Sequence, residues 1–161
     1  MQGSDFEYRI HDCPEVLYST FKDIFVELKA QDLSHLKIVQ CWQRTSNDMA
    51  SYSAQSEDER EQKTEKFLEW GRAVCEGIQK LGYWVDMVDP LAGIPVIGCQ
   101  GGSVFVETEV GIHLLGYTLL DVGCCKVLLH PQWRSKAFPS SLLTLAPHEA
   151  IQSTIQQLKL S

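Results

Sequence analysis

The stretch Ser56–Gly82, SEDEREQKTEKFLEWGRAVCEGIQKLG, decides the fold because it encodes one long amphipathic helix. Ser56 followed by Glu59 has the form of a capping box, and Gly82 suits the position just past a helix end. The sequence therefore predicts a helix over 57–81. Its second half carries an apolar stripe at helical spacing, made of Phe67, Trp70, Val74, Ile78 and Leu81.

The first ten residues of this helix, Glu57–Lys66, contain no apolar side chain. An acidic start suits the helix dipole, and such a segment is ordinarily solvated. A projecting helix end that docks a partner protein is the alternative. If the segment is only solvated, reversing Glu59 and Glu61 to lysine should cost about 0.5 kcal/mol or less per site.

The segments around this helix alternate between strand and helix patterns. A helix beginning at Pro14 has an apolar stripe at Leu17, Phe21, Phe25 and Leu28, and another begins at Pro147. Glycines at 98, 101 and 102 indicate a flexible break. Strands are predicted at 6–10, 36–45, 83–88, 94–97, 103–106, 126–130 and 141–146. We therefore expect a single α+β domain over 1–161, a mainly antiparallel sheet with packed helices.

Composition excludes several classes of protein. The chain has 161 residues and a net charge of -7, which argues against binding to a nucleic-acid backbone. No apolar stretch approaches the roughly 18 residues of a membrane span. The spacing of the six cysteines does not suggest a disulfide framework, so we expect a reducing compartment.

Two adjacent cysteines are the most informative chemical feature, in the run Asp121-Val-Gly-Cys-Cys-Lys126. Gly123 permits a turn without shielding the first thiol, and Lys126 favours thiolate over thiol. Strand alternation would place Cys125 on one face with Val127 and Leu129, which we take as the inner face. Cys124 is then the presented thiol.

The spacing of residues gives less support to three other kinds of site: a zinc site, a Cys-His pair and an acid pair. Zinc would need a fourth ligand besides Cys124, Cys125 and His130, and there is no C-x-x-C pair. A Cys-His pair stays open with His113, His130 or His148, although a histidine beside an apolar run is more often structural. Glu107 and Glu109 could form an acid pair, but we expect them to be solvated residues at a strand end.

Several stretches, in order and spacing, resemble the C-terminal domain of the methylmalonic aciduria and homocystinuria type D family. They are Cys13–Glu15, Thr45–Met49, Gly82–Trp84 with Asp86, Asp89–Pro90, Gly93 and Leu119–Val127. The resemblance implies a modified flavin nitroreductase fold without the flavin site. It also implies a cobalamin-trafficking adaptor rather than an enzyme.

In this family, a cysteine at the position of Cys124 supplies a thiolate to the cobalt of cobalamin, beside Gly123 and Lys126. The resemblance implies a heterodimer with the type C cobalamin-processing protein, with cobalamin bound only in that complex and no flavin. Methionine synthase is a second candidate partner. The cofactor then moves on to methionine synthase or methylmalonyl-CoA mutase.

The family also has a mitochondrial branch that needs a long N-terminal extension, which we expect to be absent here, so the expected location is cytoplasmic. Two rival interpretations remain open. One is a thiol- or flavin-dependent oxidoreductase on the same fold. The other is a structural or homodimeric interaction domain whose cysteines belong to the core.

Overall fold

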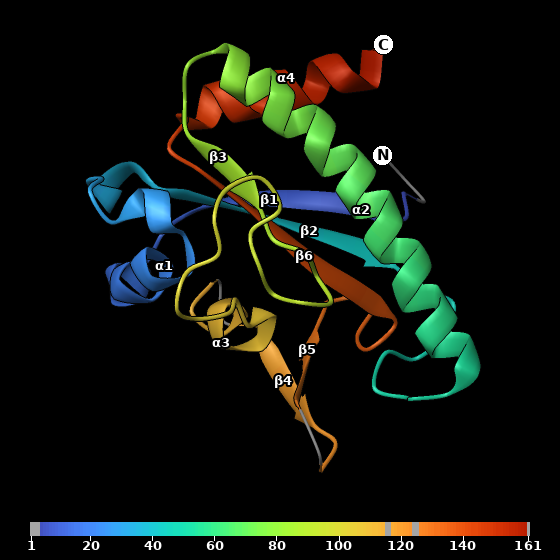
Figure 1. The fold of residues 1–161 in the computed structure, drawn as a ribbon. Coiled ribbons are helices and arrows are strands. Elements are labelled where there is room, and N and C mark those ends of the chain that lie inside the picture. Colours follow the sequence, from blue (N-terminus) through green and yellow to red (C-terminus); the bar gives the residue numbers. More distant parts are fainter. Residues whose placement is uncertain (1–3, 115–116, 124–125, 161) are drawn as a thin grey trace.

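The computed structural model describes residues 4–114, 117–123 and 126–160, which form a four-stranded antiparallel sheet, packed helices and a separate hairpin (Figure 1). The order in the sheet is β1-β2-β6-β3. The strands are β1 Phe6–Asp12, β2 Lys37–Arg44, β3 Val85–Met87, β4 Thr118–Asp121, β5 Lys126–Leu129 and β6 Ala137–Thr144. The helices are α1 Tyr18–Ile24, α2 Ala54–Lys80, α3 Glu107–Gly111 and α4 His148–Leu160, with 3₁₀ turns at Glu15–Leu17, Val26–Leu28 and Leu33–His35. The α+β prediction is confirmed.

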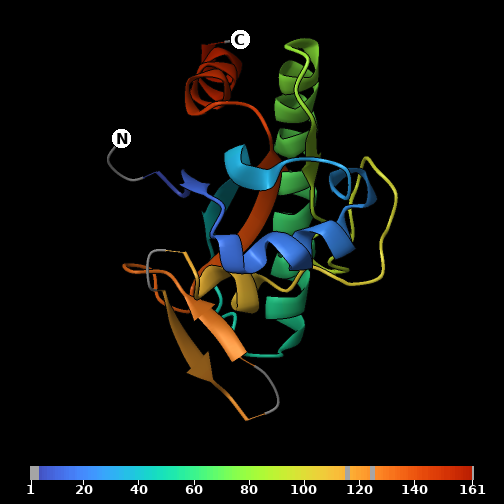
Figure 2. The same cartoon turned by 90° about the vertical axis from the view of Figure 1, so that its left-hand side faces the viewer.

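Strand β2 is buried on both of its faces. Ile38 and Trp42 belong to a core that includes residues of α1, α3 and β5, whereas Val39 and Cys41 belong to a second core with α2 and α4. Alternation along an extended strand produces these two faces. The second sheet, the β4–β5 hairpin, lies at the end of the molecule opposite both termini in the two views (Figures 1 and 2).

Strand β6 begins at Ala137, four residues earlier than predicted. Pro139 lies inside it, opposite Trp42 of β2. Strand β3 pairs only with residues 142–144 of β6, so Pro139 lies where β6 has β2 as its one neighbour in this sheet. Proline is tolerated there because its missing N–H leaves no ladder bond unmade.

Helix α2 begins three residues before the predicted start. Ser53 is the N-cap, and its hydroxyl accepts from the backbone N–H of Ser56 at 3.1 Å. The Ser56–Glu59 capping box is therefore wrong, because Ser53 offers the same hydroxyl one turn earlier. Gly82 follows the helix end with φ of 89°, as predicted.

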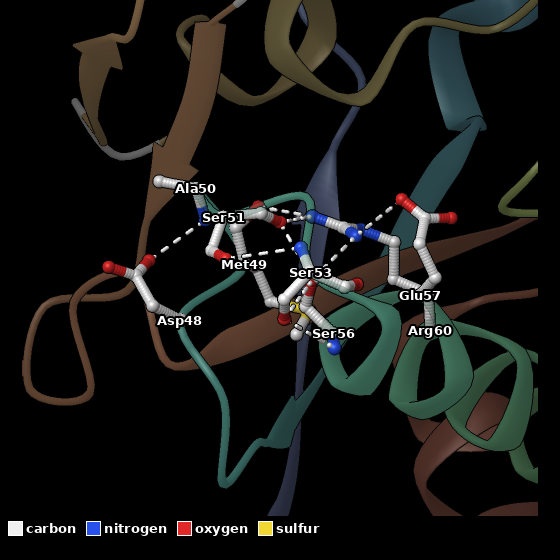
Figure 3. A network of polar contacts seen from close by, with 8 residues as sticks. All are labelled: Asp48, Met49, Ala50, Ser51, Ser53, Ser56, Glu57 and Arg60. Atoms are coloured by element: carbon white, nitrogen blue, oxygen red, sulfur yellow. Dashed lines mark hydrogen bonds and ion pairs between the residues drawn. The ribbon is translucent and has the colours of Figure 1, made fainter.

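The segment between β2 and α2 is tied to the start of the helix by Arg60 (Figure 3). The Arg60 guanidinium donates to the carbonyls of Met49 and Ser51 and contacts the Glu57 carboxylate at 3.0 Å. The Asp48 carboxylate also accepts from the N–H of Ala50 at 2.8 Å. This connection is thus an ordered, hydrogen-bonded structure.

Glu59 holds the same segment from inside. Its carboxylate accepts from the backbone N–H groups of Ser46 and Asn47, both at 2.8 Å, and from the Asn47 side chain. Burial raises the pKa of Glu59, but these hydrogen bonds outweigh it, so the net pKa is below the ordinary value. The prediction that Glu59 is merely solvated is therefore wrong.

The segment between β3 and α3 differs from the prediction in two places. No strand forms over 103–106; the chain enters α3 at Glu107 instead. The predicted break at Gly98–Gly102 is packed tightly: a Cβ on Gly101 would lie 2.1 Å from the carbonyl oxygen of Asp23. A short pairing does follow β3, since the N–H of Val96 donates to the Met87 carbonyl.

Replacing Glu59 by lysine is expected to destabilise the fold by about 2 kcal/mol, because two backbone N–H donors lose the buried carboxylate that accepts from them. Glu61→Lys, on the exposed face of the same turn, is the matched control and should cost about 0.5 kcal/mol or less. Urea unfolding of both variants measures the difference. Equal free energies of unfolding would contradict the structural role of Glu59.

Candidate functional site

Two of the predicted site residues, Gly123 and Lys126, lie at the tip of the β4–β5 hairpin. Gly123 is exposed with φ of 92°, a conformation that favours glycine, and its N–H donates to the Asp121 carboxylate at 2.9 Å. Lys126 is exposed at the start of β5 and lies opposite Asp121 in the register. Cys124 and Cys125, which connect these residues, lie outside the described part of the chain.

The assumption that Val127 and Leu129 mark the inner face of β5 is wrong. Leu128 is buried in the core with α1 and α3, Leu129 is buried too, and Val127 is half-buried. Leu128 contacts α3 so closely that a Cβ on Gly111 would lie 2.4 Å from its Cδ2. Strand phase therefore does not choose between the two cysteines, and Cys124 rests on the family resemblance alone.

His130, directly after β5, has both ring nitrogens engaged. Nδ1 accepts from the backbone N–H groups of Gln132 and Trp133, both at 3.0 Å, and Nε2 bonds to the Glu7 carboxylate. The ring is buried and stacks on Trp133 with centroids 4.2 Å apart. His130 is thus a structural histidine with no free lone pair for a metal or a thiol proton.

A groove of about 440 Å³ runs beside the start of β5. The exposed side chains of Leu91 and Val104 contribute apolar surface to it, and Lys126 and Glu107 also line it. Lys126 is two residues from Cys124 in the sequence. The groove thus combines apolar surface with one cation and two carboxylates, those of Asp89 and Glu107, and Lys126 connects it to the predicted site.

Glu107 is the residue that sequence reasoning placed most wrongly. It lies in the first turn of α3 rather than at a strand end, and its Oε2 accepts from the Ser141 hydroxyl at 3.0 Å. Although the residue as a whole is half-buried, Oε1 is inaccessible to water and has no hydrogen-bond partner among the described residues. Burial raises the pKa of Glu107 to about 7.

Two other unpartnered polar atoms lie on the same face of the sheet. Gln40 is opposite Ser141 in the register, and its amide nitrogen is buried without a partner among the described residues. The Tyr117 hydroxyl is also buried without a partner among the described residues, and the Tyr117 ring contacts Trp42. These residues are far apart in sequence, and no local pattern could have indicated this polar layer.

The four described cysteines divide by burial. Cys13, Cys41 and Cys75 are buried free thiols, whereas Cys99 is an exposed one. Burial raises the pKa of Cys13 and of Cys75 to about 12 and also raises that of Cys41. These three thiols therefore stay protonated and unreactive near neutral pH.

No cluster of three or more metal-ligating side chains forms within residues 4–114, 117–123 and 126–160. The described helices also include none with the length and apolar character of a membrane span.

Glu107→Gln should remove a pH dependence of stability. The pKa of this carboxyl is about 7 in the folded chain and about 4.3 in an unfolded one, so folding takes up a proton between these values. The wild type should lose up to about 3 kcal/mol as pH rises from about 4.5 to about 7.5 relative to the variant.

Urea unfolding at several pH values tests this, with Glu109→Gln as the matched control because Glu109 is exposed on the same helix. The control should keep the wild-type pH profile. Parallel profiles for wild type and Glu107→Gln would contradict the assignment.

Comparison with known proteins gives a consistent result. The family profile described as methylmalonic aciduria and homocystinuria type D protein matches residues 1–158. Proteins named cobalamin trafficking protein CblD from Gallus gallus and Homo sapiens are 33% and 34% identical over 145 residues, 90% of this chain. The protein of the same name from Mus musculus is 34% identical over the same share. The chain spans about half the length of these relatives, 48% of each.

Proposed function

Because the chain belongs to the methylmalonic aciduria and homocystinuria type D family, we propose that it acts in cobalamin trafficking as a non-catalytic adaptor. The observation that carries this proposal is the family match over 1–158, which includes the exposed hairpin tip with Gly123 and Lys126. The relatives are named for cobalamin trafficking.

The proposed chemistry is coordination by the cysteine pair at the hairpin tip. A thiol there would lose its proton to solvent, and the thiolate would donate an electron pair to the cobalt, with any ligand that it displaces released to solvent. Forming this bond does not itself change the oxidation state of the cobalt. Thiolate is a soft ligand suited to a transition metal. Cys124 is the proposed ligand, Gly123 leaves its approach open, and Lys126 favours the ionised form.

The proposed partner is the type C cobalamin-processing protein, which would present cobalamin to this tip in a heterodimer. A projecting hairpin suits this task, because it can reach a cofactor held by another protein (Figure 1). Four further points stay predictions from the family resemblance: delivery to methionine synthase or methylmalonyl-CoA mutase, the cytoplasmic location, the absence of flavin and the resemblance of the fold to flavin nitroreductases.

The proposal is tested by mixing this chain with cobalamin-loaded type C protein and recording the cobalt absorption spectrum. The wild type should change the spectrum, Cys124→Ser should bind the partner without changing it, and Cys125→Ser should behave as the wild type. Cys99→Ser is the matched control, because Cys99 is an exposed thiol outside the hairpin.

The outcomes separate two questions: which cysteine is the ligand, and whether this chain coordinates the cobalt at all. If Cys125→Ser abolishes the change and Cys124→Ser keeps it, the ligand is Cys125, and the hairpin tip remains the site. A wild-type complex that leaves the cobalt spectrum unchanged would overturn coordination by this chain.

A further inference from the structure

Trp42 contacts both ends of the β4–β5 hairpin. It lies in β2 and is fully buried. Tyr117, directly before β4, has its ring centroid 5.6 Å from that of Trp42, and His130, directly after β5, has its centroid 5.2 Å away. The residues that begin and end the hairpin are thus held on one indole ring.

Hydrogen bonds fix the orientation of two of these rings, those of Trp42 and His130. The Trp42 N–H donates to the Gln40 side-chain oxygen at 3.2 Å, which sets the plane of the indole. Nδ1 of His130 accepts two backbone N–H groups, so the ring proton is on Nε2 and points at the Glu7 carboxylate. Glu7 lies on β1, directly opposite Trp42 in the register.

We propose that Trp42, Tyr117, His130 and Glu7 form a root clamp that sets the direction of the hairpin and so positions the thiolate at its tip. These are positioning residues: the proposal assigns them no contact with the cargo. This inference rests on the proposed function, since the tip needs a fixed direction only if it must meet a bound cofactor.

A small rotation at the root of the hairpin produces a larger displacement at its tip. Each strand of the hairpin has four residues, which span about 13 Å. A rotation of about 10° at the root would therefore move the tip by roughly 2 Å. A metal–ligand bond tolerates deviations of only about 0.2 Å. Small freedom at the root would thus remove most productive encounters between thiolate and cobalt.

Glu7 offers the cleanest test, because it belongs neither to the hairpin nor to α3. Its polar contact with the hairpin is the one with His130, and its register partner in β2 is Trp42, so Glu7 acts on the hairpin only through members of the root clamp. Glu7→Gln keeps an oxygen that can accept from Nε2 of His130, whereas Glu7→Ala removes it. Tyr117→Phe keeps the ring on Trp42 and removes a hydroxyl without a partner among the described residues, whereas Tyr117→Ala removes the ring.

Amide hydrogen exchange of the free chain measures the clamp directly. Glu7→Ala and Tyr117→Ala should speed exchange in 118–121 and 126–129 by at least about tenfold and leave the β2–β6 ladder unchanged. Glu7→Gln and Tyr117→Phe should stay within about twofold of the wild type. Wild-type exchange rates in the Glu7→Ala hairpin would overturn the proposal, even if Tyr117→Ala does not fold.

The cobalt spectrum with loaded type C protein supplies the second measurement, well below the melting temperature of each variant. Glu7→Ala should show a slower or smaller spectral change than Glu7→Gln at equal partner binding. Faster hairpin exchange with a wild-type spectral change would overturn positioning. Absence of the change in the wild type would overturn the proposed function instead, while hydrogen exchange would still decide the clamp.

Discussion

The pairing of β2 with β6 is the constraint on which the rest of the structure depends. The register sets Ile38 against Leu143 and Val39 against Leu142, so alternate pairs face opposite cores. A slip of one residue would send every side chain of one strand to the other face. Both faces of this ladder are buried over most of their length, because helices and loops cover both.

The same ladder carries polar residues at its centre, and their burial shapes the region under the hairpin. Gln40 and Ser141 lie opposite each other on the face that also receives Trp42. Glu107 satisfies Ser141 from α3 but keeps one oxygen without a partner among the described residues. A carboxyl in this setting is favoured in its neutral form. The contact between α3 and β6 thus includes a titratable group, and β5 packs on the same helix.

Local signals in the sequence predicted the elements that they determine locally. Helix α2 ends just before Gly82, a capping glycine, and α4 starts after Pro147. The strand around Ile38 follows from its β-branched residues. Helix α3 has five residues, which is too short for a helical period. The burial of Glu59 and Glu107 depends on partners 12 or more residues away, and no local pattern reports such partners.

The hairpin depends both on local sequence signals and on contacts between residues distant in the sequence. Its tip is a run of neighbouring residues, Gly123 to Lys126, so the two candidate thiols could be named from one short run, whereas the choice of Cys124 rests on the family resemblance. Its root is encoded across the chain, since Glu7 and His130 are 123 positions apart. Motif similarity at the tip alone therefore does not establish a competent site. The proposed root clamp predicts that a chain with the same tip, but without an acceptor at Glu7 or a ring at Trp42, would carry the thiol without the geometry to use it.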